Sequence, residues 1–111
     1  MEPTAVSALT ELTELTDELE AISVAYAERF GIVRDDDWHL LKLHEEIGEL
    51  TQAHLMRQGQ ARAKGLTPGE LDDAFTREVA DVLCHVLLLA RHHDIDLGSA
   101  VAAKWLVWRR P

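Results

Sequence analysis

The fold is decided by the stretch REVADVLCHVLLLARH, residues 77–92. Between Val79 and Ala90 the only charged residue is Asp81, and the only other strongly polar side chain is His85. Apolar groups therefore cover most of the circumference of this segment, and a helix so covered is surrounded on several sides. A small chain can hardly supply that many neighbours by itself. The pattern predicts a homodimer or homotetramer with this helix near the interface.

Three further segments, before and after this stretch, have the three- and four-residue spacing of apolar residues that is typical of amphipathic helices. We expect helices over residues 4–30, 37–58 and 67–93, and a fourth from Asp96 toward Trp108. An aspartate of the run 35–37 can cap the second helix, and Thr67-Pro68-Gly69-Glu70 has the form of a capping box for the third. The sequence predicts one all-α domain, residues 1–111, built as a four-helix bundle.

The composition excludes several classes of protein. Hydrophobic residues make up 47% of the 111 residues and charged ones 28%, which is enough for a modest core and argues against disorder and against membrane spanning. The net charge of −9 repels phosphate backbones, so nucleic acid is not an expected partner. No signal peptide is visible, and a cytoplasmic location is expected. Cys84 is the only cysteine, which excludes an internal disulfide and a thiolate metal cage.

Five carboxylates form the pattern that carries chemistry. Glu45, Glu46 and Glu49 project over one arc of the second helix, whose apolar residues occupy the opposite side. By themselves they are consistent with an ordinary solvated acidic face. Glu78 and Asp81 stand one turn apart in the largely apolar third helix, where an ionised group needs a partner.

The nearby basic residues are too few to neutralise these acids. Lys42 lies beside the glutamates, and Arg77 points to another side of its helix from Glu78. Oxygen ligands without cysteine or an organised histidine pair suit a hard cation such as Mg²⁺ or Mn²⁺, which typically bridges to substrate phosphates. The two helices are therefore predicted to form a magnesium site.

The pattern Glu-Glu-x-x-Glu, followed after a spacer by Glu-x-x-Asp, resembles the signature of the all-α nucleotide pyrophosphohydrolases, the MazG-like family. The likeness covers most of the chain, from Asp37 through the glutamates and residues 78–83 to Ala103-Lys104. It implies a MazG-like bundle that cleaves a nucleoside triphosphate to the monophosphate and pyrophosphate, removing a non-standard or surplus nucleotide.

The resemblance also implies roles for single residues. Glu46, Glu49, Glu78 and Asp81 would be the metal ligands, and Glu45 would help to hold a second metal or orient the attacking water. Lys104 would bind phosphate, but Trp108 stands where the family often has an asparagine. Base specificity is therefore not carried over.

Other residues have a functional and a structural interpretation. Trp38 either stacks on a nucleobase or packs at the helix start, and Lys42 is a candidate substrate ligand. His85, one turn after Asp81, either orients that carboxylate or is a satisfied core histidine. Gly48, inside a helix, suggests close approach of another backbone. Trp105 and Trp108 are expected in the core or in a dimer contact. Three basic residues flank a flexible connection and form either a lid over phosphates or a solvated loop: Arg57, Arg62 and Lys64.

Two alternatives to the leading hypothesis stay open. One is an enzyme similar to phosphoribosyl-ATP pyrophosphatase, a relative with a similar Ala-Asp-x-x-x-His run but usually a shorter spacer than residues 50–77. The other is a non-catalytic helical dimerisation or regulatory module, in which the acids form interhelical ion pairs.

Overall fold

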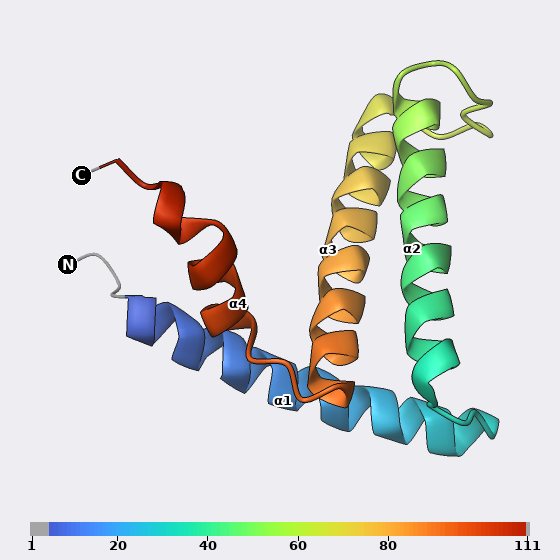
Figure 1. Ribbon diagram of the computed structural model, residues 1–111. Coiled ribbons are helices and arrows are strands. Elements are labelled where there is room, and N and C mark those ends of the chain that lie inside the picture. The colour runs from blue at the N-terminus through green and yellow to red at the C-terminus, as the bar shows by residue number, and fades with distance from the viewer. Residues whose placement is uncertain (1–4, 111) are drawn as a thin grey trace. The chain divides into compact units, whose positions relative to one another are not determined.

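The computed structural model describes residues 5–110, with side chains from residue 10 onward. Over these residues the chain forms no strand and five helical elements: α1 (Ala5–Phe30), α2 (Asp36–Arg57), α3 (Pro68–His92), α4 (Leu97–Lys104) and the 3-10 turn η1 (Leu106–Trp108) (Figure 1). The prediction of an all-α chain with four α-helices is confirmed for this part of the sequence. No helix in it is both long enough and apolar enough to cross a membrane.

The chain divides into two compact units, which we describe separately. The hairpin unit, residues 34–86, contains α2 and the part of α3 up to Val86. The terminal unit comprises the residues before 34 and after 86, and so contains α1, the end of α3, α4 and η1. The assignment of residues 1–111 to a single domain stays a prediction.

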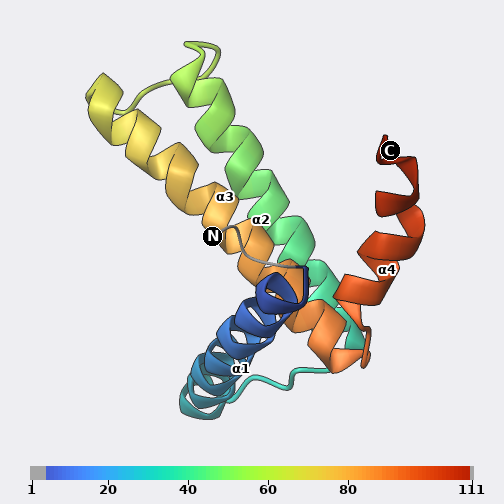
Figure 2. The same cartoon turned by 90° about the vertical axis from the view of Figure 1, so that its left-hand side faces the viewer.

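In the hairpin unit, α2 and α3 run antiparallel and side by side (Figures 1 and 2). Asp35 caps α2, because its carboxylate accepts a hydrogen bond from the Trp38 amide at 2.8 Å. At the start of α3, the Thr67 amide donates to the Glu70 carboxylate at 3.0 Å and the Glu70 amide donates to the Thr67 hydroxyl at 3.2 Å. These bonds satisfy amides that a helix start leaves without partners, and they confirm the predicted capping box.

The connection between α2 and α3 is shaped by left-handed backbone and held at its base by side chains. Gly59 and Gly65 have φ of 75° and 79°, which glycine adopts without steric cost. Below the connection, Arg57 Nε donates to Asp72 Oδ1 at 2.6 Å, and its guanidinium lies 4.6 Å from the centre of the Phe75 ring. Both contacts join the end of α2 to the start of α3.

The two sides of the hairpin unit differ in character. His39, Glu46 and Ala53 are buried, whereas the large apolar residues on the side of α2 away from the glutamates stay exposed, as do their counterparts on α3. These exposed residues are Leu40, Ile47, Val79 and Leu83. A β-carbon placed on Gly48 would meet no described atom within 4 Å beyond its own helix, so the predicted close backbone approach is wrong within this chain.

In the terminal unit, α1 is joined to the end of α3 by an ion pair between Asp17 and Arg91. Leu87, Leu88 and Ala90 of α3 are buried there. The Asp96 carboxylate caps α4 by accepting from the Ser99 amide at 3.1 Å. This capping was predicted from the turn before the fourth helix.

The fourth helix is shorter than predicted. It ends at Lys104, and the chain continues as the turn η1 rather than as α-helix to Trp108. Trp105 and Trp108 are 69% and 81% exposed, so the prediction that they pack in the core is wrong. The alternative, a contact with a second chain, stays a prediction.

Candidate metal centre

The five predicted acids meet in the hairpin unit, on facing parts of α2 and α3. One oxygen each from Glu45, Glu46 and Glu49 lie within 4.8 Å of one another, and the same is true of Glu46, Glu78 and Asp81. Residues three and four apart lie on one side of a helix, which explains both groups. Glu46 belongs to both groups and therefore lies at the centre of the cluster.

Burial makes Glu46 and Glu78 the unusual members of the cluster. Glu46 is only 7% exposed. Burial, with the charges of Glu49 and Asp81, raises its pKa to about 7. Burial likewise raises the pKa of Glu78, and the charges of Glu49 and Asp81 add to the effect. Within the described residues, neither Oε2 of Glu46 nor Oε2 of Glu78 has a hydrogen-bond partner. Both carboxylates are thus costly to ionise in the protein alone.

Within the part of the chain that the structure describes, only one of the five acids pairs with a lysine or arginine. Lys42 Nζ lies 3.2 Å from Glu45 Oε2 and forms an ion pair with it. No lysine or arginine forms an ion pair with any of the other four acids. The interhelical ion pairs expected of a purely structural module are therefore not formed at this cluster.

His85 contacts the central glutamate. Its Nε2 lies 3.9 Å from Oε1 of Glu46, and its side chain is 17% exposed. Burial lowers the pKa of His85, and the neighbouring charge of Lys42 acts in the same direction. The sequence predicted a partnership with Asp81, on the same helix, or a satisfied core histidine. The structure instead brings His85 to Glu46 across the helix pair, with a buried Nδ1 that has no hydrogen-bond partner among the described residues.

Trp38, a predicted substrate-binding residue, packs at the start of α2. Its ring lies edge-on to His39 and His85, with centroids 4.9 Å and 6.4 Å away. The guanidinium carbon of Arg34 lies 5.8 Å from the ring centre. These contacts match the structural interpretation of Trp38, and stacking on a nucleobase stays a prediction.

The remaining predicted phosphate ligands have different surroundings. Lys42 is paired with Glu45, as described above. Lys104 is the last residue of α4, in the terminal unit, and its side chain is exposed. Its role stays a prediction from the sequence pattern. Arg57 is bound by Asp72 and Phe75, which favours a structural role over that of a lid.

A small cavity that was not predicted from the sequence borders the acids. It has a volume of about 220 Å³. Glu49 and Glu78 form one edge, and the other lining residues are Gln52, Ala53, Met56, Leu66, Leu71 and Ala74. Leu66 comes from the connection between the helices, so the lining depends on the position of this connection as well as on α2 and α3. No local sequence pattern carries that information.

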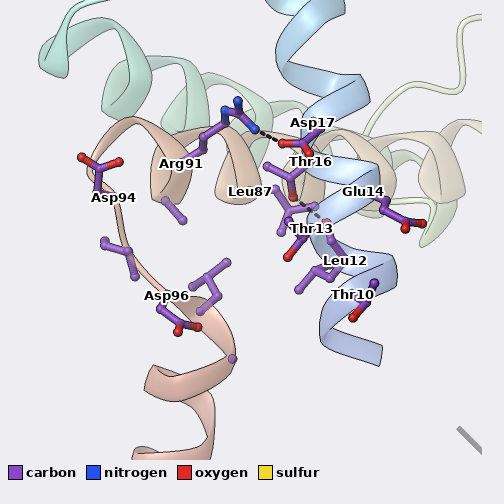
Figure 3. A pocket seen from close by; sticks show the side chains of 14 residues that line it. Thr10, Leu12, Thr13, Glu14, Thr16, Asp17, Leu87, Arg91, Asp94 and Asp96 are labelled. Atoms are coloured by element: carbon purple, nitrogen blue, oxygen red, sulfur yellow. Dashed lines mark hydrogen bonds and ion pairs between the residues drawn. The ribbon is translucent and has the colours of Figure 1, made fainter. Parts of the chain in front are cut away.

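A second cavity, of about 590 Å³, lies within the terminal unit (Figure 3). Thr10, Thr13 and Thr16 of α1 line it, together with the Asp17–Arg91 pair. It shares no residue with the acidic cluster. The candidate site for chemistry is therefore the cluster of the hairpin unit.

No family model matches this chain, and neither a curated protein nor a solved structure matches it in the comparisons.

Proposed function

We propose that the hairpin unit holds a divalent metal and that the protein is a metal-dependent nucleoside triphosphate pyrophosphohydrolase. The observation that carries the proposal is the environment of Glu46. This carboxylate is buried at the centre of five acids, and among the described residues one of its oxygens has no hydrogen-bond partner and no lysine or arginine pairs with it. When its carboxylates are ionised, a cluster of this kind is unfavourable unless a cation occupies it.

The donor set fits a hard ion. Mg²⁺ and Mn²⁺ favour carboxylate oxygens, and Glu46, Glu49, Glu78 and Asp81 would supply them. When bound, such an ion neutralises a polyphosphate and lowers the pKa of coordinated water. Glu45, more exposed and paired with Lys42, would orient the attacking water or assist a second ion. The ligands stand on helices, which hold them rigidly.

The reaction we propose is hydrolysis between the α- and β-phosphates. Water attacks the α-phosphorus, the bond to the bridging oxygen breaks, and pyrophosphate leaves with the monophosphate as second product. Lys42, the lysine beside the cluster, is proposed to bind phosphate, whereas phosphate binding by Lys104 rests on the resemblance alone. The resemblance of the two acidic motifs to the MazG-like signature supports this reaction over other metal-dependent hydrolyses.

We place the nucleobase in the cavity of about 220 Å³ that borders Glu49 and Glu78. This volume is below that of pockets that enclose a whole drug-sized ligand, so it suits a base with its phosphates outside on the acids. Met56 and Leu71 supply apolar surface, and the amide of Gln52 both donates and accepts hydrogen bonds. Gln52→Ala and Ala74→Leu should raise KM. Trp38→Ala should raise it instead if the base stacks on that ring.

The decisive experiment is a hydrolysis assay with a panel of nucleoside triphosphates and Mg²⁺, measuring pyrophosphate and monophosphate. Glu49→Gln and Asp81→Asn should abolish turnover while circular dichroism shows an intact fold. Asp72→Asn removes an acid of the same hairpin that lies outside the cluster, and it should leave turnover unchanged. Full activity in both cluster variants would reject the assignment, and no turnover of any substrate would favour a non-catalytic module.

We further propose that the protein is a homodimer. Leu40, Ile47, Val79 and Leu83 are exposed on the side of the hairpin unit away from the glutamates, where a second copy would cover them. Sedimentation should give a dimer at micromolar concentration, and Leu83→Glu should shift it toward monomer. A stable wild-type monomer would contradict the proposal, and a tetramer would extend it.

A further inference from the structure

We infer that His85 is a positioning residue for Glu46, holding one oxygen of this carboxylate so that the other is presented to the metal. The inference rests on the proposed metal centre and adds a residue that the acidic motifs do not contain. His85 touches neither substrate nor metal in this assignment. It acts through Glu46 alone.

The two oxygens of Glu46 have different surroundings. Oε1 faces Nε2 of His85 at 3.9 Å, whereas Oε2 is buried and has no hydrogen-bond partner among the described residues. The separation of 3.9 Å exceeds hydrogen-bond length, and a movement of about 1 Å by either side chain closes it. Carboxylates that bind metals are commonly fixed by such a hydrogen bond to the other oxygen.

The tautomer of His85 follows from its surroundings. Nδ1 is buried and has no partner in the described part of the chain, so a proton there would be a buried donor without an acceptor. Nε2 faces an acceptor, Oε1 of Glu46. A neutral imidazole is therefore best served by a proton on Nε2, which donates toward Glu46.

Folding stability alone does not explain a histidine at this position. An imidazole with an unpartnered buried nitrogen costs more than an apolar residue of similar size, and Asp81 and Glu78, one and two turns earlier on the same side of α3, belong to the acidic cluster. The ring lies edge-on to Trp38, 6.4 Å between centroids, which limits the directions it can take. The side chain is thus placed where Nε2 faces Oε1 of Glu46.

Two measurements on the full chain test this inference. They are Mn²⁺ affinity, followed by electron paramagnetic resonance, and the melting temperature without metal. His85→Leu should weaken Mn²⁺ affinity about tenfold or more, without lowering the melting temperature. His85→Gln keeps an N–H donor near the position of Nε2 and should restore affinity to within about threefold. Cys84→Ala, a change at the adjacent residue, should bind Mn²⁺ as the wild type does.

The outcomes separate this inference from the proposed function. If the wild type binds Mn²⁺, Glu46→Gln does not, and His85→Leu binds normally, then the metal centre stands and the role of His85 is overturned. If both His85 variants lose melting temperature and affinity together, the residue is structural, which also overturns the inference. If the wild type binds no Mn²⁺, the metal centre and the inference fail together.

Discussion

Two regions of the hairpin unit, the part near the connection and the middle of the helices, differ in whether their acids are paired with a cation. Near the connection, Asp72 is exposed and its carboxylate is bonded to Arg57 at 2.6 Å, with the guanidinium resting against Phe75. Midway along the same helices, Glu46 is buried, is surrounded by acids and has no lysine or arginine partner. The first arrangement stabilises the folded helix pair, and the second is unfavourable in the protein alone.

With the proposed metal bound at Glu46, this difference would separate the residues that stabilise the helix pair from the residues that bind the ion. Arg57 could be matched with an acid because nothing else has to bind there. A similar arginine beside Glu46 would remove the repulsion among the acids and also the reason for a cation to bind. We therefore expect substitutions in the cluster to affect metal binding, and substitutions at the connection to affect folding.

Glu46→Gln should have the largest effect. It removes the charge shared by both groups of acids, so Mn²⁺ affinity should fall by more than about 100-fold. The melting temperature without metal should rise, because repulsion within the cluster is relieved. Titration calorimetry and thermal denaturation measure both quantities. Asp72→Asn, the matched change at the connection, should leave Mn²⁺ affinity as it is. Equal losses of Mn²⁺ affinity in the two variants would contradict the distinction between the two regions.

The pH dependence of stability should report the same buried charge. The folded chain holds the Glu46 proton more tightly than the unfolded chain does, because the pKa is about 7 rather than 4.5. Between these values the folded state carries more protons, so the free energy of unfolding without metal should fall as the pH rises, by on the order of 1–3 kcal/mol. Denaturant titrations at pH 5 and pH 8 measure this.

Two controls sharpen that measurement. Glu46→Gln should lose most of the pH dependence, since the titrating group is gone. Mg²⁺ should restore stability chiefly at pH 8, where the carboxylate is ionised and ready to bind. A wild-type chain that becomes more stable between pH 5 and pH 8 without metal would contradict the buried-charge explanation.

Arg57→Gln should have a smaller effect, confined to folding. It removes an ion pair and a cation–π contact, which together contribute about 1 kcal/mol at an exposed site. Chemical denaturation should show this loss, with kcat and KM unchanged. A rise in KM for the nucleotide would instead support the lid that the sequence suggested.

Gly48→Ala should have the smallest effect, and its sign is informative. Alanine favours helix by up to about 1 kcal/mol, and a β-carbon at this position meets no described atom within 4 Å beyond its own helix. The variant should therefore be slightly more stable to denaturant. Destabilisation together with dissociation in sedimentation would show that a second copy approaches this backbone.

The sequence predicted well whatever depends on residues a few positions apart. The helices of residues 37–58 and 67–93 were expected to within two residues of α2 and α3, because their periodicity and their caps are local. Within each helix, the acids could be grouped for the same reason. Glu46 and Glu49 share one side of a helix by spacing alone, whichever partner helix they meet.

Single contacts that depend on how two helices meet could not be predicted from the spacing of residues. The spacing predicts His85 either as a partner of Asp81, one turn away, or as a core histidine, whereas its Nε2 lies near Glu46 of the other helix, a pairing that depends on how α2 and α3 meet. The cavity that Leu66 lines depends on the same arrangement. The shortening of the last helix before Trp105 was missed because Trp105 and Trp108 keep helical spacing although the helix ends.

The sharing of Glu46 by both groups of acids has a consequence for stoichiometry. If each group of acids binds an ion, the two ions share the Glu46 carboxylate, so the binding of one ion affects the binding of the other. Should two ions bind, the first would alter the oxygens left for the second, and their occupancies would be thermodynamically linked. A binding isotherm for such a centre would depart from the sum of two independent hyperbolas.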